Sequence, residues 1–149
     1  AAAHGHTLAG EARDLARRQG CNQVAPEHLA LGLLAQQRSL AREILLEMGV
    51  NAATLRDSLM EAASRHATGG PAPGDLDFDG AARRCVQIAE VEARKDAARR
   101  GTTVSEENPL STGHLLLGLV SPASSADLKP MRIHGVFYGE AAEVLRRIR

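Results

Sequence analysis

The sequence predicts an all-α fold, a pseudo-twofold eight-helix bundle made of two four-helix repeats. The first observation is composition. Ala, Leu, Arg and Glu dominate, whereas aromatic residues make up only 2% of the chain, which favours helix over strand. The second is a duplicated phrase, His-Leu-x-Leu-Gly-Leu, which begins at His28 and again at His114. The same offset carries Met-Gly-Val at 48–50 onto His-Gly-Val at 134–136. A period this long exceeds a solenoid unit, so it indicates two copies of one small helical subdomain.

Four helices are expected in the first repeat, residues 1–66. Apolar spacing and end signals place them at 4–19, from Pro26 onward, from Ser39 through Met48, and at about 52–66. The N-caps of the third and fourth are Ser39 and Asn51, and the stops of the first and third are Gly20 and Gly49. The second helix is apolar nearly all round, which places it in the middle of a bundle. Gly32 within it predicts a close crossing by a neighbouring helix.

The second repeat is expected over residues 78–149, after a Gly/Pro-rich linker at 67–77 that is too short to separate the halves. Its predicted helices are a long one at about 80–100 capped by Asp79, one capped by Thr112, one turn between Pro130 and Gly135, and a last one at 139–149. Exposed loops are expected at 101–110 and 121–129. The two repeats should pack into one compact domain.

Several function classes are disfavoured by composition. The formal net charge of zero argues against a general nucleic-acid or membrane surface. No apolar run is long enough to span a membrane and no signal peptide is visible, so a cytoplasmic protein is the default. The two cysteines, Cys21 and Cys85, form neither a disulfide framework nor a metal motif, and no cofactor is expected.

Two histidines recur at equivalent positions, His28 and His114. A metal site would need a second ligand at a usable helical spacing, and none is visible. We therefore predict structural, hydrogen-bonded histidines and no bound metal. An enzyme using Glu27 and His28 as acid and base is the competing hypothesis. It is disfavoured because adjacent helical residues point about 100° apart.

The repeated phrase carries a family resemblance. The stretches 25–33 (Ala-Pro-Glu-His-Leu-Ala-Leu-Gly-Leu) and 111–119 (Ser-Thr-Gly-His-Leu-Leu-Leu-Gly-Leu) are similar to the phrase Gly-Thr-Glu-His-Leu-Leu-Leu-Gly-Leu of the Clp/Hsp100 N-terminal repeat domain. The ClpC type is the most similar. The family's Phe-Thr-Pro-Arg-Ala, which opens the second repeat, corresponds to Phe-Asp-Gly-Ala-Ala at 78–82. The resemblance covers essentially the whole chain, and it implies a receptor for substrates and adaptors that has no chemistry of its own.

No phosphate-loop motif of the form Gly-x-x-x-x-Gly-Lys-Ser/Thr occurs in the sequence. The chain is therefore expected to be either a fragment of an unfoldase or a small Clp-N-like protein without the motor. Its departures from the family pattern favour a motor-less ClpC-like protein of an actinobacterium. Such a protein would bind peptides or cyclic peptides and act as a decoy or regulator of the ClpC–ClpP system. The alternative is the receptor N-domain of a full ClpC-type unfoldase, which binds phosphoarginine or adaptors.

The resemblance implies two phosphoarginine sites, each pairing a carboxylate of the Glu-His phrase with a Thr near the start of the same repeat. The carboxylate would bind the guanidinium, while the hydroxyl and helix N-termini bind the phosphate. Glu27 keeps the first carboxylate, but the Thr position falls on Ala2. In the second repeat Gly113 replaces the carboxylate and Asp79 replaces the Thr. We expect a degenerate first site, in which Glu27 could equally be a plain first-turn residue, and a non-functional second one.

The resemblance also implies a groove for cyclic peptide antibiotics between the first helices of the two repeats. The matching residues are Phe78, Arg83 and Gln87, with Ala9 and Gly10 opposite. An aromatic side chain beside small residues makes a good floor for an apolar ligand. The competing interpretation is that Phe78 only fills the seam between the repeats.

Overall fold

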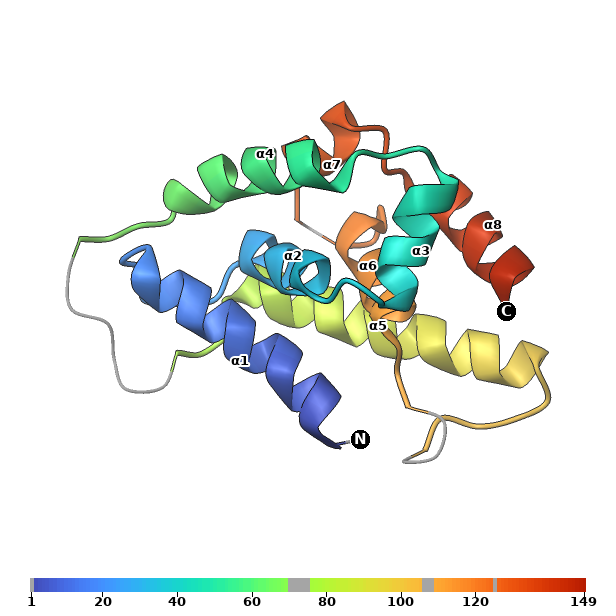
Figure 1. Cartoon of the computed structure of the whole chain (residues 1–149). Helices are drawn as coiled ribbons and strands as arrows, with labels where there is room; N and C mark the ends of the chain where they lie inside the picture. Colours follow the sequence, from blue (N-terminus) through green and yellow to red (C-terminus); the bar gives the residue numbers. More distant parts are fainter. Residues whose placement is uncertain (1, 70–75, 106–108, 125) are drawn as a thin grey trace.

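The computed structural model describes residues 2–69, 76–105, 109–124 and 126–149, with side chains from Leu8 onward. These residues form eight α-helices and no strand (Figure 1), which confirms the predicted fold class. The helices are α1 (Ala2–Arg18), α2 (Pro26–Ala35), α3 (Leu40–Glu47), α4 (Ala52–Ser64), α5 (Gly80–Arg99), α6 (Thr112–Val120), α7 (Lys129–Ile133) and α8 (Tyr138–Ile148).

The two copies of the repeated phrase, α2 and α6, lie in the middle of the molecule (Figure 1). Their leucines form the centre of the core, and Leu29, Leu33, Leu116 and Leu119 are each 1% exposed. In each repeat the first helix packs on the second, α1 on α2 and α5 on α6. An apolar helix in this position buries nearly every side chain, which explains why its sequence shows no polar face.

The crossings in the two repeats occur at equivalent glycines. At Gly32 an added Cβ would lie 3.2 Å from the Leu8 carbonyl oxygen, which confirms the predicted close approach. At Gly118 it would fall on the Cys85 carbonyl oxygen, closer than real Cβ atoms come, and 3.0 Å from the Ala89 nitrogen. The backbones of α5 and α6 therefore approach more closely than those of α1 and α2.

The repeats pack directly on one another. Helix α3 contacts α6 and α8, α4 contacts α7, and α2 contacts both α5 and α6. A short parallel bridge joins Val24 to Phe78. In it the Val24 N–H donates to Asp77 O and the Asp79 N–H donates to Val24 O, both at 2.9 Å. The start of the second repeat is thus tied to the α1–α2 connector.

Most predicted end signals are confirmed. Ser39 and Asn51 accept hydrogen bonds from backbone N–H groups at the starts of α3 and α4, as Asp79 does for α5. Gly20 and Gly49 follow helices with φ of +75° and +73°, a conformation that favours glycine.

Other boundaries differ from the predictions. The N-cap of α6 is Ser111, so the prediction of Thr112 was wrong. Thr112 is the first helical residue, and its Oγ1 accepts a 3.0 Å hydrogen bond from the Ala41 N–H of α3. Helix α1 begins two residues early, α4 ends two residues early, and α7 and α8 each begin one residue early. Parts of the predicted linker and loops, residues 70–75, 106–108 and 125, lie outside the described residues.

Candidate functional site

In both repeats the histidine of the repeated phrase accepts a backbone hydrogen bond at the N-terminus of its own helix. The Nδ1 atom of His28 accepts a 2.9 Å hydrogen bond from the Ala25 N–H, three residues earlier. In the second repeat His114 Nδ1 accepts the Ser111 N–H at 3.0 Å. Each ring thus takes the place that Glu or Gln has in a capping box. Because a backbone N–H can only donate, Nδ1 carries no proton and Nε2 is the donor in both rings.

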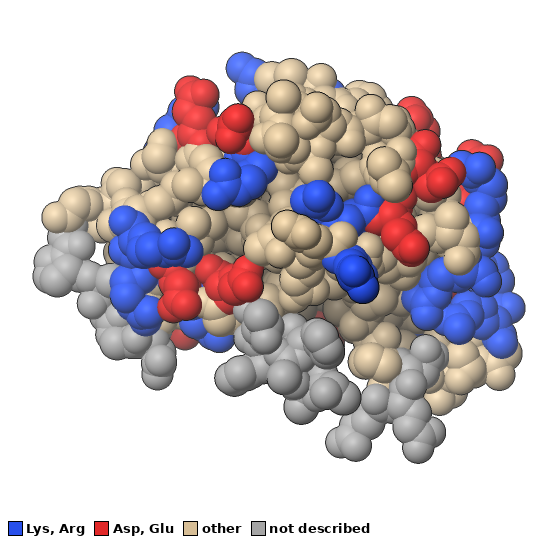
Figure 2. All heavy atoms as spheres, in the orientation of Figure 1, with Lys and Arg blue, Asp and Glu red and all other residues tan. Residues whose placement is uncertain are grey.

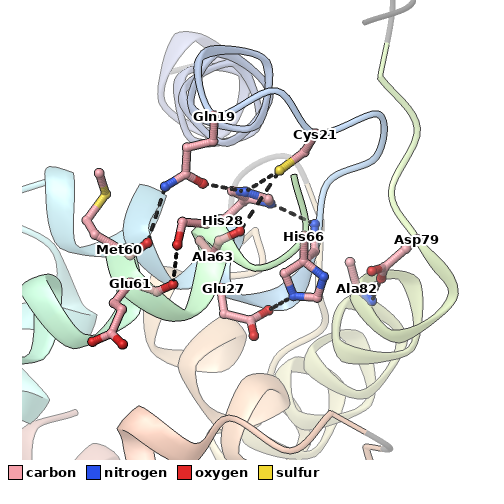
Figure 3. A network of polar contacts seen from close by, with 12 residues as sticks. Gln19, Cys21, Glu27, His28, Met60, Glu61, Ala63, His66, Asp79 and Ala82 are labelled. Atoms are coloured by element: carbon pink, nitrogen blue, oxygen red, sulfur yellow. Dashed lines mark hydrogen bonds and ion pairs between the residues drawn. The ribbon is translucent and has the colours of Figure 1, made fainter. Parts of the chain in front are cut away.

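In the first repeat the Nε2 of His28 meets neutral partners (Figure 3). It donates to Gln19 Oε1 at 3.0 Å, and the Gln19 amide in turn donates to Met60 O at 3.3 Å. The Cys21 sulfur lies 3.7 Å from the same nitrogen. Burial lowers the pKa of His28 to about 4, and the neighbouring His66 adds to the lowering. His28 is therefore a neutral structural residue at pH 7.

In the second repeat the partner of the histidine is charged. His114 Nε2 lies 3.0 Å from Asp96 Oδ2, and both residues are 3% exposed. Burial lowers the pKa of His114, while the hydrogen bond to Asp96 works in the opposite direction. Arginine side chains rather than the imidazole neutralise this carboxylate: Arg99, Arg100 and Arg149 all form ion pairs with it.

The possible metal ligands and nucleophiles of the described part of the chain are placed as follows. No group of three His, Cys, Asp or Glu residues there is placed to hold a metal ion. Both cysteines are free and buried. Burial raises the pKa of Cys21, and it raises that of Cys85 to about 11, so both are protonated thiols at neutral pH. Glu27 contacts His66, whereas the His28 ring contacts Gln19 and Cys21.

Glu27 opens onto a hollow between α4 and α7. Its carboxylate is 13% exposed and lies 3.1 Å from His66 Nε2, at the end of α4 (Figure 3). The hollow has a volume of about 370 Å³. Its lining comprises Glu27, Ser58, Glu61, Ala62, Arg65, His66, Asp127, Lys129, Pro130 and Ile133. His66 was not among the sequence candidates, because its contact with Glu27 is purely tertiary.

The structure does not bring together the positions that were expected to pair in the phosphoarginine site of the first repeat. Gln19, just after the end of α1, contacts His28, the residue next to Glu27. Ala2 lies seventeen residues before Gln19, at the other end of α1, which separates the two residues by roughly 25 Å along the helix. Asp79 of the other repeat is instead held on the α1–α2 connector, where its N–H donates to Val24 O at 2.9 Å, three residues before Glu27. The Asp79 side chain itself caps α5, accepting the Ala82 N–H at 2.7 Å.

Gly113 lies in a packed interface. It is buried at the start of α6, and an added Cβ would lie 3.1 Å from Leu40 Cδ2 and 3.2 Å from Leu145 Cδ1. A glutamate side chain would therefore have to displace the Leu40 and Leu145 side chains. Asp79 is also far from it, because Asp96, the contact of His114, lies seventeen residues further along α5. The structure thus does not bring Gly113 and Asp79 together.

The residues proposed for the cyclic-peptide groove lie on α1 and at the start of α5. Arg83 and Gln87 are exposed, whereas Ala9, Gly10 and Phe78 are half-buried. The Phe78 ring lies under Arg13 of α1, with the guanidinium carbon 5.3 Å from the ring centroid. Arg13 Nε also donates to Leu76 O at 3.1 Å.

Arg13 was missed in the sequence, although it follows Ala9 by one helical turn. That spacing was the available signal. Phe78 therefore lines the seam between the repeats and still keeps part of its ring accessible.

A second hollow, which the sequence did not indicate, lies between α6, α7 and the start of α8. Its volume is about 560 Å³. Phe137, on its rim, is 48% exposed. Phe137 occupies the N-cap position of α8 and makes no side-chain cap, whereas Asn51 caps α4 at the equivalent place in the first repeat.

Comparison with known proteins gives one consistent family. The model for the Clp repeat (R) N-terminal domain matches residues 7–129. A ClpA homolog of Guillardia theta, named as an ATP-dependent Clp protease ATP-binding subunit, is 33% identical over 110 residues, 73% of this chain and 12% of that protein. The chloroplastic chaperone protein ClpC of Pisum sativum is 31% identical over 110 residues, 73% of this chain and 11% of that protein. The chain thus spans only a small part of the length of these relatives.

The fold is also similar to solved domains. The Hsp104 N-terminal domain from Candida albicans has a TM-score of 0.74 at 13% identity, and the match covers 97% of this chain and 88% of that one. At this identity the likeness concerns the fold alone. Among the described residues, no helix is both long enough and apolar enough to cross a bilayer.

Proposed function

The chain belongs to the Clp repeat N-terminal domain family, and from this premise we propose that it works by binding peptides or cyclic peptides and not by catalysis. The observation that carries the proposal is the α1–α5 face. There the half-buried Phe78 ring is stacked against Arg13, and Arg83 and Gln87 are exposed. An aromatic floor bordered by hydrogen-bonding side chains fits a ligand with apolar side chains and an exposed peptide backbone.

Phosphoarginine is not the ligand that these residues favour. Glu27, the carboxylate that would bind the guanidinium, already pairs with His66. The position that would contribute a hydroxyl to the phosphate is an aspartate whose side chain caps α5. Losing a charge-assisted hydrogen bond and gaining a repulsive charge costs about ten- to a hundredfold in affinity.

The role that we propose for this binding is that of a decoy or regulator of a ClpC–ClpP system, in a motor-less ClpC-like protein of an actinobacterium. The departures from the family pattern at Ala2, Asp79 and Gly113 support it, because a substrate receptor would be expected to keep the family's residues at these positions. The alternative is a substrate- or adaptor-receiving N-domain of a full ClpC-type unfoldase. The gene distinguishes the two, since a phosphate-loop ATPase encoded downstream in the same frame would contradict the decoy role.

Calorimetry with a ClpC-directed cyclic peptide tests the site. Phe78→Ala should weaken binding at least about tenfold, because it removes the aromatic floor. Phe137→Ala is the matched control, since it deletes the only other phenylalanine from a different surface. Circular dichroism checks that both variants are folded. Equal affinity of the wild type and Phe78→Ala would remove Phe78 from the site.

The phosphoarginine argument has its own titration. Free phosphoarginine should give no measurable heat at concentrations that saturate the cyclic peptide. Tight binding at two sites would refute the argument from Glu27, Asp79 and Gly113.

A further inference from the structure

The C-terminal ends of α5 and α8 meet at a buried carboxylate that positions several surface arginines. Asp96 is 3% exposed and pairs with Arg99 through Oδ1. Its Oδ2 lies 3.3 Å from Arg149 Nη1 and 3.7 Å from Arg100 Nη1. Because burial lowers the pKa of the fourth partner, His114, that ring adds no charge near neutrality. One negative charge is therefore shared by three guanidinium groups.

A second carboxylate, Glu92, is also shielded from solvent and is also paired with a cation. Glu92, whose side chain is 11% exposed, accepts the Tyr138 hydroxyl at 2.8 Å and lies 3.7 Å from Lys95 Nζ. Arg146 of α8 is exposed, and its charge acts on Tyr138. Both acids thus lie below the surface. The side chains of Lys95, Arg99 and Arg100 lie on it, exposed by 65%, 44% and 38%, whereas that of Arg149 is 19% exposed.

This arrangement gathers positive charge at one end of a chain whose formal net charge is zero. Figure 2 shows one group of Lys and Arg side chains on the right, where Figure 1 places the ends of α5 and α8, besides smaller groups on the left and in the middle of the same face. Helix C-termini favour cations, but one or two per helix satisfy that effect. Here the guanidinium groups are also fixed by Asp96, and each keeps further N–H donors beyond the one that contacts it.

We propose that this basic surface, made of Lys95, Arg99, Arg100, Arg146 and Arg149, binds an acidic segment of a partner protein. Guanidinium groups match carboxylates in charge and in planar, two-point geometry. Their attachment to Asp96 removes part of the ordering cost of binding. The surface is confined to two helix ends, whereas nucleic acid would call for a longer basic track contacting several phosphates. It lies at the opposite end of α5 from Phe78, so it is separate from the proposed peptide groove.

Fluorescence anisotropy with a labelled glutamate-rich peptide, measured with the 149-residue chain at low and moderate salt, tests the proposal. We expect binding that weakens as salt rises. Lys95→Gln/Arg146→Gln should weaken it about tenfold, at about threefold per charge. Neither residue touches Asp96, so the fold should be retained. Arg56→Gln/Arg84→Gln removes the same charge from exposed positions elsewhere and should change affinity less than twofold.

The remaining outcomes overturn the proposal. No binding of the peptide at low salt, or an equal loss in the two double variants, would mean that no localised acidic-peptide site exists. A 20-base-pair duplex that binds more tightly than the peptide would assign the surface to nucleic acid. Inorganic phosphate that competes at the same concentration as the peptide would make it a small-anion site.

Discussion

In the first repeat the buried histidine, His28, donates to a neutral amide, Gln19, whereas in the second repeat His114 meets a charged carboxylate, Asp96. Gln19 and Asp96 lie at equivalent places, at or just beyond the end of the first helix of their repeats. The neutral version shows that the fold requires only a hydrogen-bond acceptor here. The charged version is accompanied by Arg99, Arg100 and Arg149, which all pair with Asp96, and the Arg99 and Arg100 side chains reach the surface. A buried polar difference thus becomes a difference in surface chemistry.

Removal of the two histidine partners, Asp96 and Gln19, should give the largest difference in stability loss between the repeats. Asp96→Ala leaves three arginines without their shared carboxylate and His114 without an acceptor, so we expect a loss of about 3–5 kcal/mol in unfolding free energy. Gln19→Ala breaks only neutral hydrogen bonds and should cost about 1–3 kcal/mol. Urea denaturation of both variants measures the difference. A cost for Gln19→Ala that equals or exceeds that of Asp96→Ala would contradict the comparison.

The acid sensitivity of the two histidines should also differ. Unfolded His28 titrates near 6.5 and folded His28 near 4, so between these values the unfolded chain binds more protons. The contribution that neutral, buried His28 makes to the free energy of unfolding is therefore complete above about pH 6.5. As the pH falls toward 4 it declines by up to about 3 kcal/mol.

Denaturation at pH 7.5 and 4.5 measures this effect. The wild type should lose unfolding free energy between pH 7.5 and pH 4.5, and His28→Gln should reduce this loss. His114→Gln should reduce it less, because Asp96 opposes the lowering of the His114 pKa. An equal reduction by the two variants would show that the neutral and charged environments do not differ in this respect.

Alanine substitutions at the two helix crossings, Gly32 and Gly118, should give the smallest difference in stability between the repeats. Gly118→Ala places a methyl group on the Cys85 carbonyl of α5, where backbone must move, and overpacking of this kind costs about 1–3 kcal/mol. Gly32→Ala meets the Leu8 carbonyl at 3.2 Å, and the better helix propensity of Ala, about 1 kcal/mol, offsets much of the strain. Thermal unfolding should therefore rank Gly118→Ala below Gly32→Ala, and the reverse order would show that the α5–α6 approach is not the tighter one.

The sequence predicted the helices well because their signals are local. Apolar spacing, capping side chains at Ser39, Asn51 and Asp79, and glycine stops at Gly20 and Gly49 act within a turn of the backbone. The Thr112 error arose because Ser111 and Thr112 are both good caps; in the structure Ser111 caps α6, while the Thr112 hydroxyl accepts the Ala41 N–H of α3. The repeat boundaries at 1–66, 67–77 and 78–149 and the cytoplasmic location stay predictions.

The candidate sites depended on distance across the fold, which a repeat in sequence does not supply. The repeat correctly marked Glu27 and Gly113 as the point where the two halves differ. It also suggested partners within each repeat, whereas Gln19, at the opposite end of α1 from Ala2, is the residue that contacts His28. The N–H of Asp79, from the other repeat, donates to Val24 O on the same connector. The Arg13–Phe78 stack and the Glu27–His66 pair join residues 65 and 39 positions apart, beyond any local signal.

By itself the sequence determined an all-helical, duplicated domain, the identity of its two central helices, and the roles of the buried histidines as hydrogen-bonded structural residues. These properties follow from periodicity and from side-chain chemistry, which each residue carries wherever the chain places it. Only the tertiary structure decided which carboxylates share a site, which glycine crossing is tighter, and where the arginines gather. Those properties depend on the approach of separate helices, and that approach is set by the packing of the whole core.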